Sequence, residues 1–383
     1  MRSLLLFIAL VPSLAFAWGF DGHRKLASLM QDAMPAGHCL RTWFLVRQTA
    51  ARQDDACDPD RWKEDDATKP EGQKEWPRHF LDIDYATPIT AYPRNFADVQ
   101  AWRPQFAFSN GIVPWYVEQK YADLVAAFSA KDEAAILDNA FLLSHYASDS
   151  MSILHSTKNF DPNQGPDGLD GLHWRWESQM FFANSHVTGM AAAAQPYIGS
   201  AGVADPRNNT FDFVLVGNGL VDGLIAADNA SDGGPDSLYN LTKDMTARRW
   251  ADAIVFISSL LWSAWNDAGR PELVGFVQGC SMAAPMGDPV VNGFPPPGGF
   301  THTPDAGAED AGVDGGVDAG PAGGGTGAIG GGGGTLPATG GPWFLGGGAG
   351  GGGDEEPTGC GCTNVPGAAI AMLGFVALFR RRR

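Results

Sequence analysis

Glycine is the residue that most restricts where this chain can form a packed core. Of its 50 glycines, 28 fall within residues 281–359, a stretch with nine acidic residues and no Lys or Arg. Such a composition buries too little apolar surface to offset the entropy lost when the backbone is ordered. We therefore expect residues 284–359 to be a disordered linker rich in Gly, Pro and Asp. The folding unit is then a single domain over residues 18–283.

The N-terminal segment has the pattern of a targeting sequence. Residues 1–17 combine a basic start, an apolar run over residues 4–11 and the sequence Ala15-Phe16-Ala17, which together are typical of a secretory signal peptide. Cleavage after Ala17 would make Trp18 the mature N-terminus. A retained membrane anchor is the alternative, and the short apolar run disfavours it.

The C-terminal segment, residues 360–383, contains two cysteines, an apolar helix over residues 365–379 and four arginines. This three-part pattern resembles the MYXO-CTERM class of surface-sorting tags. The resemblance implies a sorting and processing machinery as partner, cleavage near the cysteines and attachment at the cell surface. A plain C-terminal membrane anchor is the alternative. In both cases the linker would act as a stalk between the domain and the membrane.

Export predicts an oxidising environment for the cysteines. Cys39 and Cys57 lie in the same early region, and we expect them to pair and close a short loop. Cys280 has no obvious partner within the domain, and its pairing elsewhere stays open.

Helical periodicity dominates residues 18–283 and predicts an all-α domain with long loops. We expect helices over residues 23–34, 131–155, 172–183 and 237–266, the second opening after Ser129 as N-cap. Residues 211–216 are the only strand candidate. Residues 84–112 are expected to form a long loop rich in proline and aromatic residues.

Histidine and carboxylate residues recur at helical spacing. His145 and Asp149 are four residues apart on one expected helix and share a face, and His155 follows six residues later. His173 and Glu177 form a second such pair on another helix. Zinc binds imidazole nitrogen and carboxylate oxygen, and two pairs on separate helices can converge in a bundle core. One pair alone is equally well explained by a surface hydrogen bond, but both together indicate a metal site.

Further motifs lie upstream: Trp18-Gly19-x-x-Gly22-His23, Asp60 in Ala56-x-x-x-Asp60, and His79-Phe80-x-Asp82. With H-x3-D-x5-H and H-x3-E, they resemble the zinc-dependent phospholipases C and the S1/P1-type nucleases. These are all-α enzymes with a cluster of three zinc ions. The resemblance covers most of residues 18–265, and it implies one multi-helix domain of this type.

The resemblance also implies nine metal ligands, with Trp18 binding through its free amino group and carbonyl oxygen. The ligands are Trp18 and His23 for the first zinc, Asp60, His79 and His145 for the second, Asp149 bridging those two, and His155, His173 and Glu177 for the third. Because the α-amino group exists only after cleavage, an uncleaved chain should lack at least one zinc.

Several assignments stay open. Asp58 competes with Asp60 as a ligand, since Asp58-x-x-Arg61 also resembles a family motif, and we prefer Asp60. The phosphate-contacting cation is Arg61 or Lys63. The spacing from Asp60 to His79 is longer than the family pattern.

Four other polar residues have predicted supporting roles. Asp82 and Asp84 are expected to orient ligands rather than to bind metal. His38 and His186 match no motif and are expected to be structural or exposed.

The implied reaction is hydrolysis of a phosphodiester by a zinc-activated water. We predict that this water lies between the ions joined by Asp149 and that Asp60, the catalytic residue, orients or deprotonates it. The third zinc would stabilise the leaving oxygen.

Two substrates fit these motifs. Gly171-Leu172-His173-x-x-x-Glu177 and the surface tether favour a phospholipid. So does the acidic charge, with 43 Asp+Glu against 26 Lys+Arg, because an acidic domain lacks the footprint that grips a nucleic-acid backbone.

The short Trp18-to-His23 spacing favours a single-strand nuclease, whose loop aromatics would stack bases. Core packing is the commoner role of such aromatics, which are Trp102, Phe106, Phe108, Trp115 and Tyr116. The prediction is a phospholipase C-like enzyme, with a nuclease as runner-up. A catalytically silent, metal-stabilised binding module is the alternative of another class.

Overall fold

The computed structural model describes residues 18–104, 108–163 and 171–300. These residues are mostly helical, as the sequence predicts, and their only β-structure is two isolated bridges. The α-helices are α1 (Gly19–Ser28), α2 (Cys39–Leu45), α3 (Ala50–Asp55), α4 (Asp58–Trp62), α5 (Phe96–Trp102), α6 (Val113–Ala130), α7 (Glu133–Asp149), α8 (Leu172–Glu177), α9 (Asn184–Ala194), α10 (Pro206–Asn218), α11 (Val221–Ala230) and α12 (Pro235–Asp267). Short 3-10 helices join them: η1 (Lys63–Thr68), η2 (Glu71–Gln73), η3 (Trp76–His79), η4 (Ile83–Tyr85), η5 (Ile89–Ala91), η7 (Leu154–Ser156), η8 (Gln179–Phe181) and η9 (Gln195–Tyr197).

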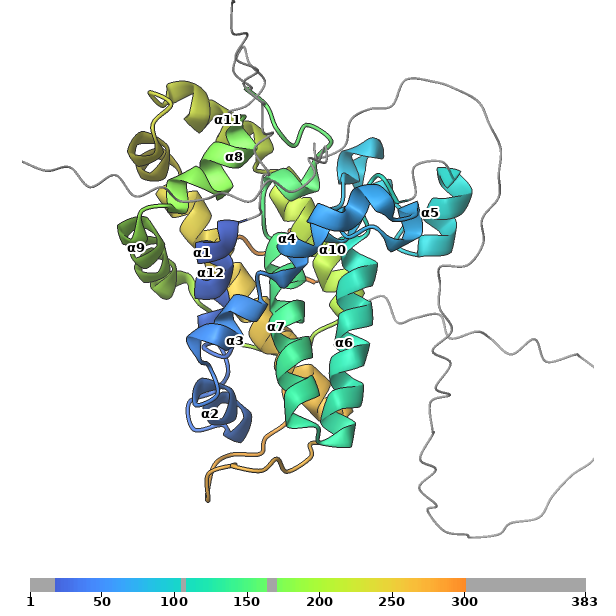
Figure 1. Ribbon diagram of the computed structural model, residues 1–383, viewed down its shortest axis with the longest axis vertical. Helices are drawn as coiled ribbons and strands as arrows, with labels where there is room; N and C mark the ends of the chain where they lie inside the picture. Colours follow the sequence, from blue (N-terminus) through green and yellow to red (C-terminus); the bar gives the residue numbers. More distant parts are fainter. Residues whose placement is uncertain (1–17, 105–107, 164–170, 301–383) are drawn as a thin grey trace, which may run out of the picture.

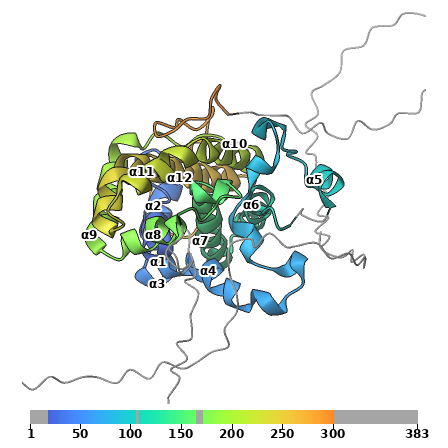
Figure 2. The same cartoon turned by 90° about the horizontal axis from the view of Figure 1, so that it is seen from above.

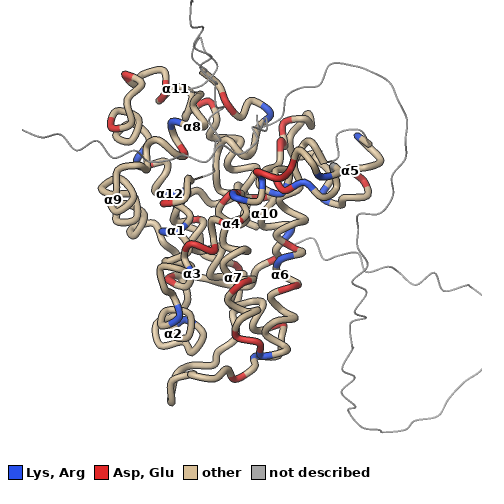
Figure 3. Tube along the Cα trace, in the orientation of Figure 1, with Lys and Arg blue, Asp and Glu red and all other residues tan. Residues whose placement is uncertain are grey.

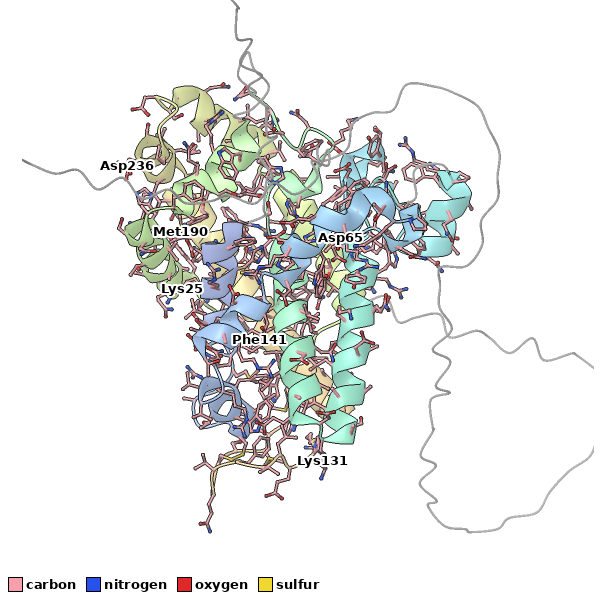
Figure 4. All side chains as sticks on the ribbon, in the orientation of Figure 1. Lys25, Asp65, Lys131, Phe141, Met190 and Asp236 are labelled. Carbon is pink, nitrogen blue, oxygen red and sulfur yellow. A yellow bond between two sulfur atoms is a disulfide. The ribbon has the colours of Figure 1, made fainter. Side chains whose placement is uncertain are left out.

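The centre of the body is built by α6, α7 and α12, which run along its long axis (Figure 1). Seen from above, α12 lies between α9 on one side and the pair α6 and α7 on the other, and it contacts all three (Figure 2). Residues 249–265 of α12 are buried on every face, as expected for a helix enclosed by other helices. Phe141 projects from α7 into the interior and is fully buried (Figure 4).

The start of α7 differs from the expected one. Ser129 does not cap this helix but lies in the last turn of α6, where its hydroxyl donates to Val125 O. The chain reverses at Lys131, which has a φ of 54°, and the Asp132 carboxylate accepts from Ala135 N at 3.2 Å. Asp132 is therefore the N-cap, because its side chain satisfies a backbone donor that Ser129 cannot reach.

Other expected elements shift in similar ways. The predicted helix over residues 23–34 is α1, which begins and ends earlier, and the helix over 172–183 is divided into α8 and η8. The helix over 237–266 is confirmed as α12. Residues 84–112 contain η4, η5 and α5 rather than one uninterrupted loop.

The predicted strand over residues 211–216 is wrong, because these residues lie within α10. Asp205 caps this helix by accepting from Asn208 N at 2.9 Å, and Pro206 occupies its first turn. Phe211, Phe213 and Val214 are buried. A short apolar run has the same composition in a buried strand and in a buried helix.

The predicted Cys39–Cys57 disulfide is also wrong. Cys39 pairs with Cys280, with a Cα–Cα distance of 5.0 Å, because Ser281 forms a β-bridge with His38 and brings the two cysteines together. Cys57 keeps a buried free thiol whose Sγ donates to Phe20 O at 3.4 Å. Burial raises the pKa of this thiol to about 12.

The folded body extends beyond the expected boundary at residue 283. Val290 N donates to Ser200 O, and Phe294 N donates to the buried Asp252 carboxylate. Phe300 packs on Phe213 with ring centroids 5.3 Å apart. Residues 284–300 therefore belong to the domain, while the rest of the expected linker lies outside the described residues.

Arg249 links this C-terminal segment to the centre of the body. Its guanidinium is fully buried, pairs with Asp252 at 3.3 Å, and donates to Met151 O at 2.8 Å and to Phe213 O at 3.0 Å. Met151 lies two residues after the end of α7. The arginine thus holds the turn that separates His155 from Asp149.

The expected signal peptide (residues 1–17) and sorting tag (residues 360–383) lie outside the described residues. Within the described part, one stretch over residues 206–230 is long and apolar enough to cross a membrane. Half of its most apolar window is buried in the body, and the stretch is divided into α10 and α11. These properties are those of core helices.

Candidate metal centre

Eight of the expected ligands lie close together in the interior, although they come from six separate elements. They are His23 on α1, Asp60 on α4, His79 on η3, His145 and Asp149 on α7, His155 on η7, and His173 and Glu177 on α8. Each of these eight residues is at most 4% exposed. The long central helix α7 is the common element, because α1, α4 and η3 all contact it.

The side chains form three groups that can hold a metal ion. The first consists of His23, Asp60 and His145, and the second of His79, His145 and Asp149. His145 belongs to both groups, so the two positions are neighbours. Asp149 reaches both as well, because its Oδ1 lies 3.3 Å from His23 Nε2 and its Oδ2 lies 2.7 Å from His79 Nδ1.

The third group consists of His155, His173 and Glu177. Glu177 Oε2 lies 2.6 Å from His173 Nε2 and 3.6 Å from His155 Nε2. The other carboxylate oxygen accepts from Ser152, which follows α7. This hydrogen bond fixes the carboxylate so that its second oxygen faces the two imidazoles.

Protein contacts on the far side of several imidazoles determine which nitrogen faces each group. His145 Nδ1 contacts Ala56 O and His155 Nδ1 contacts His79 O, each at 2.7 Å. His23 Nδ1 contacts the Ser148 hydroxyl at 3.2 Å. In each of these residues Nε2 is the nitrogen directed at the group. Backbone and hydroxyl partners of this kind orient histidine ligands in metal proteins.

Buried polar atoms without a hydrogen bond are concentrated in the three groups. They include His23 Nε2, both carboxylate oxygens of Asp60, Asp149 Oδ1, both ring nitrogens of His173, and Glu177 Oε2. Buried polar atoms are nearly always satisfied in folded proteins, so this many together require a further partner. Imidazole nitrogen and carboxylate oxygen are both ligands that divalent transition metals accept. The donor set therefore fits bound metal ions.

Burial and mutual interaction shift the pKa of several groups. Burial lowers the pKa of His23 to about 3 and that of His173 to about 4, so both imidazoles are neutral and ready to bind a cation. Burial also lowers the pKa of His155 and raises the pKa of Glu177 to about 8. For Asp149, burial opposes ionisation, but the nearby His145 and His23 outweigh it and hold its pKa well below the usual value.

The structure separates the residues that the sequence left as alternatives. Asp60 lies in the first group, whereas Asp58 is outside all three and pairs with Arg61 at 2.7 Å. Arg61 also pairs with Asp54 at 2.9 Å. Lys63 is buried, and its Nζ lies 2.7 Å from Asp60 Oδ1. The cation at the site is therefore Lys63.

Trp18 lies against the same region. Its indole Nε1 donates at 2.8 Å to the carbonyl oxygen of Ser148, the residue that precedes Asp149 in the chain. Its ring packs on Trp176 and Trp250. Trp18 can lie this close to α1 only because residue 22 is glycine, since a Cβ at Gly22 would lie 2.8 Å from Trp18 Cβ. The indole is thus an anchor that fixes Trp18 beside α7.

One of the two acids expected to orient ligands contacts other groups instead. Asp84 accepts from Thr157 and from Lys158 N rather than from an imidazole. Glu75, which is not among the residues selected from the sequence, lies behind His79 with 3.6 Å between Oε1 and Nε2. Burial opposes the charge on Glu75, but His79 and Arg78 outweigh it and lower its pKa to about 2. Its spacing of four residues from His79 was the available signal.

His38 and His186 lie outside the three groups, as expected. His38 is buried beside Trp262 and contacts Ala283 O at 3.0 Å, so it is structural. His186 stacks on Tyr239 and lies 3.1 Å from Asp236.

The aromatic residues after residue 100 serve packing for the most part. Trp115 contacts Phe96 and Phe211, and Tyr116 contacts Tyr146. Trp102 is 43% exposed. Phe106 lies outside the described residues.

Comparisons with known proteins do not assign this chain. No protein-family model matches it, and no curated protein is significantly similar to it.

Proposed function

We propose that this protein is an exported, zinc-dependent phosphodiester hydrolase of the phospholipase C type. The observation that carries the proposal is the convergence of eight buried His, Asp and Glu side chains into three groups, several of whose donor atoms lack hydrogen bonds. Nitrogen and oxygen donors of this kind suit zinc. One zinc ion in each group would give the three-ion site that the sequence motifs imply.

Trp18 would complete the site once a leader is removed. The free α-amino group of a mature N-terminus has a pKa of about 7.7–8.0 and loses its proton readily beside a metal. The indole donates to Ser148 O, which keeps Trp18 next to Asp149. The Ser148 hydroxyl in turn contacts His23. The main chain of Trp18 would then serve as the ninth ligand.

Bound zinc would supply activation of a water and neutralisation of the charge that builds on the phosphoryl oxygens. Asp60 would orient the attacking water and accept its proton through Oδ2, because the carboxylate is fully buried and Oδ2 lacks a hydrogen bond. Lys63, paired with Asp60 Oδ1, would donate to a phosphoryl oxygen. Glu177, fixed by Ser152, would hold the leaving-group side of the site.

Catalysis is favoured over a purely structural role. Structural zinc sites are usually closed by four protein ligands, whereas the third group offers three side chains, so a fourth ligand position would be left for a water or substrate oxygen. A buried lysine beside the groups adds an anion contact that a structural site does not need.

A phospholipid is favoured over a nucleic acid. Lys and Arg are interspersed with Asp and Glu along the described chain, and Arg24, Arg52 and Arg61 are engaged with neighbouring carboxylates (Figure 3). A nucleic-acid backbone calls for a continuous basic surface. Of the aromatic residues that could stack bases, Trp115 and Tyr116 are packed against other rings, and Trp102 is exposed.

The test uses the purified exported protein, stripped of metal and then reloaded with zinc. Phosphatidylcholine vesicles and single-stranded DNA are supplied in parallel. Zinc-dependent release of phosphocholine and diacylglycerol supports the proposal, whereas release of nucleotides alone supports the nuclease alternative. Bound zinc with no hydrolysis of either substrate identifies a metal-stabilised binding module and rejects the proposal.

A further inference from the structure

Glu75 is a buried carboxylate that lies next to the metal groups without belonging to any of them. It is 2% exposed. Its Oε1 lies 3.6 Å from His79 Nε2, on the side of the imidazole opposite to the group that contains Asp149. His79 Nε2 is itself a buried nitrogen without a hydrogen bond. At 3.6 Å the two atoms lie just beyond hydrogen-bond distance, and a small shift of either side chain would join them.

Three neighbours fix the position of this carboxylate. Tyr146 donates its hydroxyl to Glu75 Oε1 and Arg78 donates to Oε2, each at 2.5 Å. Asp66 accepts from the backbone N of Glu75 and of Trp76, each at 2.7 Å. Asp66 lies on η1, between the ligands Asp60 and His79. The extra residues that separate these two ligands are therefore folded so that they deliver Glu75 behind His79.

The opposite ring nitrogen of His79 faces the metal groups. Nδ1 lies 2.7 Å from Asp149 Oδ2, 3.0 Å from His145 Nε2 and 3.8 Å from Asp60 Oδ1. The other imidazoles of the first two groups have a backbone or hydroxyl partner behind them, at Ala56 for His145 and Ser148 for His23. Glu75 occupies the equivalent place for His79, with a charged acceptor instead of a neutral one.

We propose that Glu75 is the positioning residue for His79 in the second metal group. Its carboxylate accepts the Nε2 proton, which fixes the ring orientation, leaves the Nδ1 lone pair for the metal and strengthens that nitrogen as a ligand. The inference rests on the proposed metal centre but not on the identity of the phosphodiester. Asp82 and Asp84, the acids expected in this role, are not needed for it.

The test compares Glu75→Gln with Glu64→Gln, a matched change at an exposed acid of the same segment. Metal-free proteins are titrated with Co2+, and both the affinity and the visible absorption spectrum of each bound ion are recorded. Glu75→Gln is expected to weaken one ion by about 10–100-fold and to change its spectrum. Glu64→Gln is expected to match the parent protein.

Glu75 also supports Tyr146 and Arg78, so a loss of packing must be separated from a loss of orientation. Tyr146→Phe removes one hydrogen bond to the same carboxylate but leaves the carboxylate behind His79. It is expected to keep the Co2+ affinity nearly unchanged, while urea unfolding reports any change in stability.

Parent affinity for every ion in Glu75→Gln would overturn the proposal. So would an equal loss in Tyr146→Phe, or a parent protein that binds no divalent ion. A parent protein that binds Co2+ but hydrolyses no phosphodiester would reject the proposed function alone, because every measurement here is of metal binding.

Discussion

His79 Nδ1 and Asp149 Oδ2 lie 2.7 Å apart, although 70 residues separate them in sequence. Asp149 is held by the rigid end of α7, whereas His79 ends a short 3-10 helix in a segment with little regular structure. The geometry of the second metal group therefore depends on the contacts that fix this segment to α7.

Asp149 joins the first two groups, so its loss should affect both. Asp149→Asn keeps the shape of the side chain but removes the negative charge that lies next to His23 and His79. Loss of an outer partner of a metal ligand costs about 10–100-fold, and we expect loss of this shared ligand to lower hydrolysis by more than about 100-fold. Zinc content, measured by elemental analysis, should fall as well. The control is Asp138→Asn, at a side chain on the same helix that is 57% exposed. Full activity of Asp149→Asn with three bound zinc ions would exclude the bridging role of Asp149.

Metal binding at the third group should release a proton at neutral pH. Burial raises the pKa of Glu177 to about 8, so the metal-free carboxyl is largely protonated at pH 7 and must ionise to bind a cation. The affinity for metal should rise with pH up to about 8 and then level off. Calorimetry in buffers of different ionisation enthalpy measures this release. Glu177→Gln should abolish this proton release. The control Glu133→Gln, at an exposed ion pair with Arg47, should leave it unchanged. Unchanged proton release in Glu177→Gln would show that Glu177 is not the source of the proton.

Arg249 should contribute strongly to stability, because it is fully buried and its loss leaves Asp252 unpaired in the interior. Breaking one side of a buried ion pair costs about 3–5 kcal/mol, which is the expected loss for Arg249→Met. The neighbouring Arg248 pairs with Asp244 on the surface, and Arg248→Met should cost less than about 1 kcal/mol. Urea unfolding of the metal-free proteins compares the two. If Arg249→Met also lowered the free energy of unfolding by less than about 1 kcal/mol, the buried ion pair would contribute little to stability.

The Cys39–Cys280 disulfide joins the two ends of the domain across 241 residues. Replacing both cysteines with serine should lower the free energy of unfolding by about 2–5 kcal/mol, since the cross-link restricts the unfolded chain. Peptide mapping without reduction should recover these two cysteines in one linked pair. Cys57 should react with a thiol reagent only after unfolding, because it is buried. A Cys39–Cys57 peptide would contradict the structure.

Much of this protein is determined locally and can be predicted from the sequence alone. Apolar spacing predicts the long helix α12, and the i,i+4 spacing of His145 with Asp149 and of His173 with Glu177 predicts which side chains share a helix face. These features depend on neighbouring residues, whose geometry the helix itself imposes.

Other features were decided only by tertiary contacts. Residues 211–216 are helical because they pack within the body, and Cys39 pairs with Cys280 because a β-bridge at His38 brings the two ends of the domain together. Residues 284–300 remain folded because Asp252 and Phe213 supply partners for them. The choice of Asp60 over Asp58 depends on how α4 packs against α7. Such contacts join residues far apart in the chain, and local spacing carries no information about their distance in space.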